Sequence, residues 1–327
     1  MRPSKRLMPY LLVFFYIVLQ SASCMAAVTA APGQSAGKTS ALTLGQAAVL
    51  GVVEGLTEYL PVSSTGHLLL AERVMGIGES VALTPEERKR TKEASDAYTI
   101  CIQAGAILAV FGLYFRRVRQ MLQGLMGKDA AGRQLLTNVV VGFLPAAVIG
   151  LAFNKLIKSY LFGTWPVILA WFFGGLAILA VSWRNKHKET GAQSGLSIME
   201  LSWRMALIIG FAQCIAMWPG VSRSLVTIVG GLLVGLTLSA AVEFSFLLGL
   251  ITLSAATAYD ALKHGQVMLQ TFDALSLAVG VFFAFVAAVL SVKWMVGYLN
   301  RHGLAIFGYY RVALALVAGT LLMNGVL

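Results

Sequence analysis

Long apolar segments separated by short polar stretches set the pattern of the chain. They span residues 97–115, 135–153, 165–183, 240–258, 275–292 and 304–323. Each approaches the roughly 20 residues that an α-helix needs to cross the hydrocarbon core of a bilayer. The pattern therefore predicts an all-α integral membrane protein.

The composition supports this class. Only 12% of the residues are Asp, Glu, Lys or Arg, and 58% are hydrophobic, whereas soluble domains carry about 25% charged residues. The net charge of +11 comes from Lys and Arg in short loops, where cations set membrane orientation. Because no basic patch is interleaved with aromatic residues, we expect membrane lipids and no nucleic acid as partners. Three cysteines are too few for a disulfide framework.

The N-terminal segment has the plan of a targeting signal. Basic residues precede the apolar run Leu7–Leu19, and small residues such as Ala26 and Ala27 follow it. This order is typical of a secretory signal peptide. We expect residues 1–30 to be a cleaved signal, with a retained anchor helix as the alternative.

Two parts of the chain show the same order of features, which suggests an internal repeat. Each has an apolar helix, a proline and then, three residues later, a serine: Pro61 with Ser64, and Pro219 with Ser222. Three long apolar segments follow in each part. We therefore expect two homologous halves, residues 42–190 and 198–327, forming one membrane domain.

Loop charges predict opposite orientations for the two halves. Cations cluster after residues 115, 183 and 292, so these loops are cytoplasmic by the positive-inside rule. Residues 154–164 and 259–274 then lie outside. By this count residues 42–70 and 205–238 each enter and leave the membrane on one side. We expect two inverted repeats, each a re-entrant helical hairpin plus three transmembrane helices. Eight plain spans, the alternative, would leave the Pro-Ser turns facing lipid.

The first hairpin carries two acidic residues. Glu54 and Glu58 are four residues apart, share one helix face and are followed by a proline that breaks the helix. Ser63 or Ser64 is suited to cap a new helix beginning near Gly66. Because buried carboxylates repel and are costly inside a membrane, this pair predicts a functional site that holds a cation.

The second hairpin adds a cation, Arg223, between Ser222 and Ser224 and near Thr227. The two helix N-termini would point at one centre, where free N–H groups favour an anion. The guanidinium fork of Arg223 matches phosphate oxygens. Simpler explanations stay open: the serines could only cap helices, and Arg223 could only neutralise the glutamates.

These residues resemble the signatures of a known family, the undecaprenyl-diphosphate phosphatases once called bacitracin-resistance proteins. The first matching stretch runs from Glu54 to His67, the second from Pro219 to Thr227, and a shorter one includes Gln103. The resemblance implies hydrolysis of undecaprenyl diphosphate, which recycles the carrier lipid for cell-wall glycans. It also implies a divalent cation, Mg²⁺ or Ca²⁺, a bacterial inner membrane location and a site open to the periplasm.

We assign roles on this basis. The expected catalytic residues are Ser64, His67, Glu58 and Arg223, the expected substrate contacts are Ser63, Thr65, Ser222, Ser224, Thr227 and Gln103, and the expected metal ligands are Glu54 and Glu58. In the favoured mechanism Ser64 attacks phosphorus and either His67 or Glu58 takes its proton. The sequence leaves open whether Ser64, His67 or water is the nucleophile.

A transporter or flippase of a phosphorylated polyprenyl lipid is the rival hypothesis, because inverted repeats with broken helices are typical of transporters. The combination of two glutamates and a histidine favours an enzyme, since binding alone needs no acid–base groups. Whether the chain forms a homodimer is left open.

Overall fold

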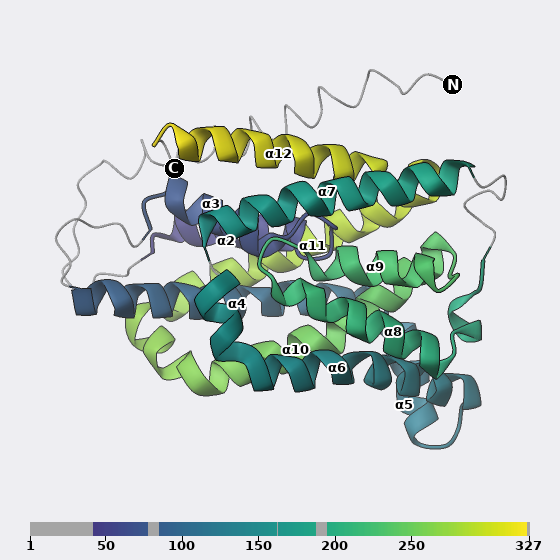
Figure 1. Ribbon diagram of the computed structural model, residues 1–327. Helices are drawn as coiled ribbons and strands as arrows, with labels where there is room; N and C mark the ends of the chain where they lie inside the picture. Colours follow the sequence, from purple (N-terminus) through teal and green to yellow (C-terminus); the bar gives the residue numbers. More distant parts are fainter. Residues whose placement is uncertain (1–41, 78–84, 162, 188–194, 326–327) are drawn as a thin grey trace.

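The computed structural model describes residues 42–77, 85–161, 163–187 and 195–325, and these form a bundle of helices (Figure 1). The predicted signal or anchor, residues 1–30, lies outside the described residues. The helices are α2 (Leu44–Thr57), α3 (Ser64–Val74), α4 (Pro85–Leu113), α5 (Phe115–Leu125), α6 (Ala130–Leu161), α7 (Thr164–His187), η1 (Ile198–Glu200), α8 (Trp203–Cys214), η2 (Ile215–Met217), α9 (Arg223–Leu233), α10 (Leu238–Thr271), α11 (Ala274–His302) and α12 (Ala305–Met323).

Five helices in the described part of the chain are long and apolar enough to cross a membrane: α11, α12 and parts of α6, α7 and α10. A sixth span results if α4 and α5 are counted together, although α5 departs from the axis of α4 by 78°. The predicted apolar segments all fall within these helices. The prediction of an all-α, multi-pass membrane protein is therefore confirmed.

Three stretches predicted as loops are helical. The basic stretch after residue 115 forms α5, which buries Val118 and Met121 and exposes Arg116 and Arg119. The loop prediction was wrong here because the arginines alternate with apolar residues at helical spacing, which makes a surface helix. Helices α6 and α10 also continue beyond their apolar parts, to Leu161 and Thr271, because a helix keeps satisfying its own backbone groups as it leaves the bilayer.

The two expected hairpins are present as pairs of short helices. Helix α2 starts at a capping box between Thr43 and Gln46 and has 14 residues, about 21 Å at the usual rise and too short to cross a bilayer. Helix α3 begins at Ser64, two residues before the predicted start at Gly66. The second pair is α8, extended by η2, and α9.

Each hairpin packs mainly against the other half of the chain. Helix α2 lies on α11, where Gly51 faces the backbone of Gly280, and α8 lies on α6, where Gly210 faces the backbone of Gly142. Helices α7 and α12 lie along each other (Figure 1). Such reciprocal packing is what two repeats related by an axis in the membrane plane would give.

Helices α7 and α12 also contact each other through a pair of glycines, one from each half. A Cβ added at Gly175 would lie 3.0 Å from the carbonyl oxygen of Gly308, and one added at Gly308 would lie 3.0 Å from that of Gly175. Both positions need glycine for this close approach. The repeat is consistent with these contacts, while the opposite orientation of the halves stays a prediction.

The structure changes the register of the repeat. Ser63 and Ser222 adopt the same backbone conformation, with φ of 73° and 79°, and Gly51 and Gly210 are equally far from them in sequence. Aligned in this way the hairpins need no gap, and Ser63, not Ser64, corresponds to Ser222. The predicted match through the two prolines was one residue off, because proline breaks a helix at either of two neighbouring positions.

We predict the following topology in a cysteine-free background with single cysteines added. In intact cells, Lys128→Cys and Arg301→Cys should be protected from a membrane-impermeant thiol reagent, while Tyr160→Cys and Leu262→Cys should be labelled. All four positions are exposed, so access of the reagent depends on the side of the membrane. Labelling in lysed cells is the control. The reverse pattern would contradict the inverted topology.

Candidate functional site

The site is built on two broken helices whose turns have the same unusual backbone. Ser63 and Ser222 are the non-glycine residues with positive φ in the described part of the chain. Serine in this region is strained, and such strain persists only where the surroundings fix it. Ser222 caps α9 by accepting a hydrogen bond from the Leu225 N–H at 3.3 Å, whereas the Ser63 side chain makes no capping bond to α3.

Hydroxyls of the second turn hold the first turn. Ser224 Oγ donates to the carbonyl oxygen of Leu60 at 2.8 Å and lies 2.9 Å from Ser222 Oγ. Ser222 Oγ is itself 3.5 Å from the Leu60 oxygen. Thr227 Oγ1 contacts Ser245 Oγ at 2.7 Å, inside the protein. Ser222 and Ser224 thus join the two hairpins, whereas Thr227 connects α9 to α10.

Three of the predicted catalytic residues meet at the junction of the turns. The Ser64 hydroxyl donates a short hydrogen bond to Glu58 Oε2. The other oxygen of Glu58, Oε1, lies 3.6 Å from Nη2 of Arg223. The side chains are almost fully buried, with 6% of the Glu58 and 9% of the Arg223 side chain exposed. A hydroxyl, a base and a cation from opposite halves of the chain are thus in one contact set.

Arg223 keeps free donors in this setting. Its Nη1 donates to the carbonyl oxygen of Ser245 at 3.0 Å, and its guanidinium lies 5.4 Å from the ring centre of Tyr59. The same group packs on Gly249, where any Cβ would collide with it. Nε and Nη2 have no hydrogen-bond partner. Buried unpaired donors are costly, so they mark a place where an anion would be bound.

Glu54 lies one helical turn before Glu58 and is 1% exposed. The Gln103 side chain, which accepts a hydrogen bond from Thr257 Oγ1 at 3.2 Å, lies near the Glu54 carboxylate. The Glu54 Oε1 atom has no partner. The predicted contact residue Gln103 thus lies beside Glu54.

His67 makes its hydrogen bonds outside this contact set. Its Nδ1 donates to the carbonyl oxygen of Ser63 at 2.6 Å, and Nε2 lies 2.7 Å from the Tyr310 hydroxyl. The rings of His67 and Tyr310 are stacked. Since the partner of the Ser64 hydroxyl is Glu58, the geometry favours Glu58 over His67 as the proton acceptor. The remaining predicted contact, Thr65, is exposed at the start of α3.

Glu54 and Glu58 could hold a divalent cation such as Mg²⁺ only together with the substrate. The described residues contain no group of three or more His, Cys, Asp and Glu side chains that could hold a metal alone. Mg²⁺, however, is commonly bound by one or two carboxylates together with phosphate oxygens of the substrate. Glu54, with its unpaired oxygen, and Glu58 match that requirement.

Sequence reasoning missed Arg311, which is fully buried in α12 and contacts both turns. A signal for it existed, because it is a lone cation within the apolar segment 304–323. Ionisable residues inside a membrane are functional by default. The prediction used that rule for the hairpins and not for the last helix.

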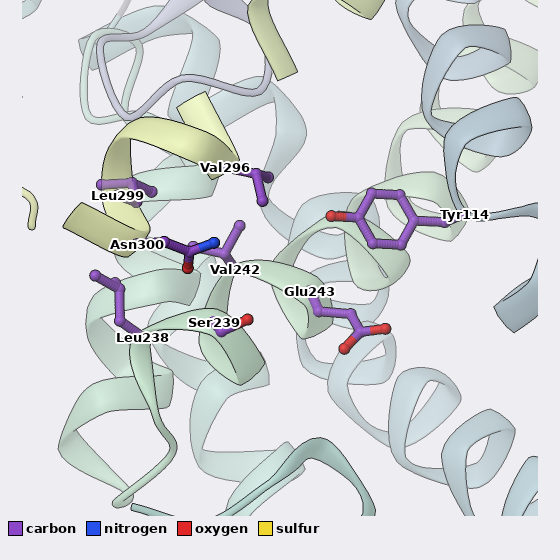
Figure 2. Close-up of a pocket in the computed structure, with 8 residues that line it drawn as sticks. All are labelled: Tyr114, Leu238, Ser239, Val242, Glu243, Val296, Leu299 and Asn300. Carbon is purple, nitrogen blue, oxygen red and sulfur yellow. The ribbon is translucent and has the colours of Figure 1, made fainter. Parts of the chain in front are cut away.

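A separate hollow of about 240 Å³ lies between the start of α10 and the end of α11 (Figure 2). Tyr114 and Asn300 point into it, and Glu243 lines its edge. Glu243 is paired with Arg117 at 2.7 Å. None of the predicted site residues lines this hollow, so it is distinct from the site.

The chain is similar to known proteins over most of its length. A family profile described as "Bacitracin resistance protein BacA" matches residues 47–317. A relative from Sorangium cellulosum named undecaprenyl-diphosphatase is 43% identical over 270 residues, which cover 82% of this chain and 83% of the relative. One of that name from Rhodopseudomonas palustris is 44% identical over 280 residues, or 84% and 94% of the two chains.

Proposed function

The chain belongs to the bacitracin resistance protein BacA family, and we propose that it hydrolyses undecaprenyl diphosphate at the junction of its two hairpins. The products are undecaprenyl phosphate and inorganic phosphate. The reaction recycles the carrier lipid for cell-wall glycan synthesis. The substrate is a lipid, and a multi-pass membrane enzyme meets it within the bilayer.

The contact set of Ser64, Glu58 and Arg223 carries the proposal. It combines a nucleophile held by a base with a cation that has unpaired donors. Phosphoryl transfer needs mainly positioning and neutralisation of charge, and this set supplies both. Helix α3 begins at Ser64, and the free backbone N–H groups of its first turn further attract an anion.

In the first step the Ser64 oxygen attacks the terminal phosphorus. A bond forms between Ser64 Oγ and phosphorus, the bridging P–O bond breaks, and undecaprenyl phosphate leaves with the bridging oxygen. Glu58, which accepts the hydrogen bond of Ser64, takes the proton. The free donors of Arg223 stabilise the negative charge on the transferred group.

In the second step water attacks the phosphoserine. The bond between phosphorus and Ser64 Oγ breaks, Glu58 returns its proton to the serine oxygen, and the water protons leave with the released phosphate. The alternative has water attack the diphosphate directly, with Glu58 as its base.

A divalent cation, Mg²⁺ or Ca²⁺, held by Glu54 and Glu58 would neutralise the diphosphate and draw electron density from its oxygens. Gln103 lies near Glu54, where its amide is suited to orient the carboxylate. We further propose that the protein lies in the bacterial inner membrane and that the site opens to the periplasm, as the family resemblance implies.

The first test is phosphate release from undecaprenyl diphosphate by the purified protein in detergent, where transport cannot be measured. We expect release that stops with a chelator and returns with Mg²⁺. Glu54→Gln should raise the Mg²⁺ concentration needed for half activity at least about tenfold and remove the rise in Tm caused by Mg²⁺. Glu200→Gln, an exposed position, is the control. Full release in the presence of chelator would exclude the cation.

Ser64 and Glu58 should act as one unit. Ser64→Ala and Glu58→Gln should each lower kcat by about 10²–10⁴-fold, and the double variant should be little worse than the stronger single variant. Ser239→Ala, at the separate hollow, should be unaffected. If Ser64→Ala keeps most of the rate while Glu58→Gln loses it, water is the nucleophile.

Arg223→Lys should lower kcat about 100-fold, the scale of losing one preorganised donor, with little change in Tm. Lysine keeps the charge and loses the planar fork. The comparison is Arg301→Lys, an exposed cation at the end of α11. Activity of Arg223→Lys within a few-fold of the parent would mean that Arg223 only neutralises Glu58.

A further inference from the structure

Arg311 connects the two turns through a single guanidinium group. It lies in α12 with no exposed surface. Its Nη1 donates to the carbonyl oxygen of Pro61 at 3.3 Å, and its Nη2 donates to that of Gly220 at 2.8 Å. Nη2 and Nε also contact the carbonyl oxygens of Ala170 and Trp171 in α7, at 2.8 and 3.4 Å. The group therefore ties both hairpins to one helix.

The two turn carbonyls occupy equivalent positions. In the register given by Ser63 and Ser222, Pro61 corresponds to Gly220. Pro61 lies three residues before Ser64, and Gly220 lies three residues before Arg223. The distance between these two carbonyls thus governs how the serine and the arginine of the site approach each other.

A guanidinium is the side-chain group suited to this task. It offers five N–H donors in a fixed plane, whereas the ammonium of lysine is a point with three. All four hydrogen bonds of Arg311 go to backbone carbonyl oxygens. Among the described residues, none of its hydrogen-bond partners is a carboxylate that would neutralise its charge. Burying a cation in this way is costly, and an apolar side chain would fill the space at lower cost.

We propose that Arg311 is a positioning residue for the hydrolysis. By holding the Pro61 and Gly220 carbonyls at a fixed spacing, it sets the approach of Arg223 to Glu58 and Ser64. It touches neither the reacting atoms nor these side chains, so it acts through Arg223. This inference rests on the proposed function.

Gly174 provides a way to test the position of the guanidinium without removing it. The three atoms nearest to a Cβ added at Gly174 all belong to the Arg311 guanidinium. Gly174→Ala therefore displaces the group while its charge is kept. Gly112 is a matched control, because a Cβ added there meets nothing within 4 Å and the change Gly→Ala is the same.

The experiment measures kcat, KM and Tm in detergent for Gly174→Ala, Arg311→Lys and Gly112→Ala. We expect Gly174→Ala and Arg311→Lys to lower kcat at least about tenfold, with KM within threefold of the parent and Tm close to that of Gly112→Ala. A purely structural role would instead lower Tm and leave kcat per folded molecule unchanged, and that result overturns the proposal. If neither Gly174→Ala nor Arg311→Lys folds, the role of Arg311 is structural and the proposal is likewise overturned.

A double-mutant cycle tests whether Arg311 acts through Arg223. In an Arg223→Gln background, measured at high enzyme concentration, Gly174→Ala should change kcat less than twofold. An equal fold loss in both backgrounds would contradict the proposal. Absence of phosphate release by the parent would refute the proposed function itself, so the two failures are distinguishable.

Discussion

The whole arrangement depends on satisfying backbone carbonyls where helices break inside a bilayer. Lipid offers the turns no hydrogen-bond partners, so the carbonyls of each broken helix need donors from the protein. The Leu60 carbonyl receives them from Ser224 and the Pro61 carbonyl from Arg311. The hydrogen bonds that make the turns tolerable are therefore the ones that bring the halves together. The site thus forms where these hydrogen bonds to the turn carbonyls hold the two hairpins together.

The gap-free register explains why two similar hairpins form one site. Gln213 and Met217 occupy the places of Glu54 and Glu58 in the second hairpin, and Arg223 occupies that of Ser64. In the proposed mechanism the first half thus provides the base and the hydroxyl, and the second half provides the cation. A symmetrical pair of hairpins would place like charges together, which is unfavourable in a low-dielectric interior.

Much of this organisation was predictable because it depends on local patterns. Apolar length predicts the spans, and Glu54, Glu58 and Arg223 stand out as charges in apolar segments. The contact of Ser64 with Glu58 instead of His67 was not predictable, because it depends on side-chain directions after a strained turn. The link from Ser224 to Leu60 was equally hidden, since only tertiary packing brings residues so far apart in sequence together. Helix α5 was missed because charge was taken as evidence of a loop.

The reciprocal packing of the hairpins has a consequence for biosynthesis. Helix α2 and the two glutamates at its end are made early, but the packing partner α11 and the proposed positioning residue Arg311 belong to the last part of the chain. During insertion the carboxylates enter the membrane before any of their cationic partners exist. They must then remain protonated or near the lipid headgroups, because an isolated charge in the bilayer core is unfavourable. With the role proposed for Arg311, the hydrolytic site is complete only when synthesis has reached α12.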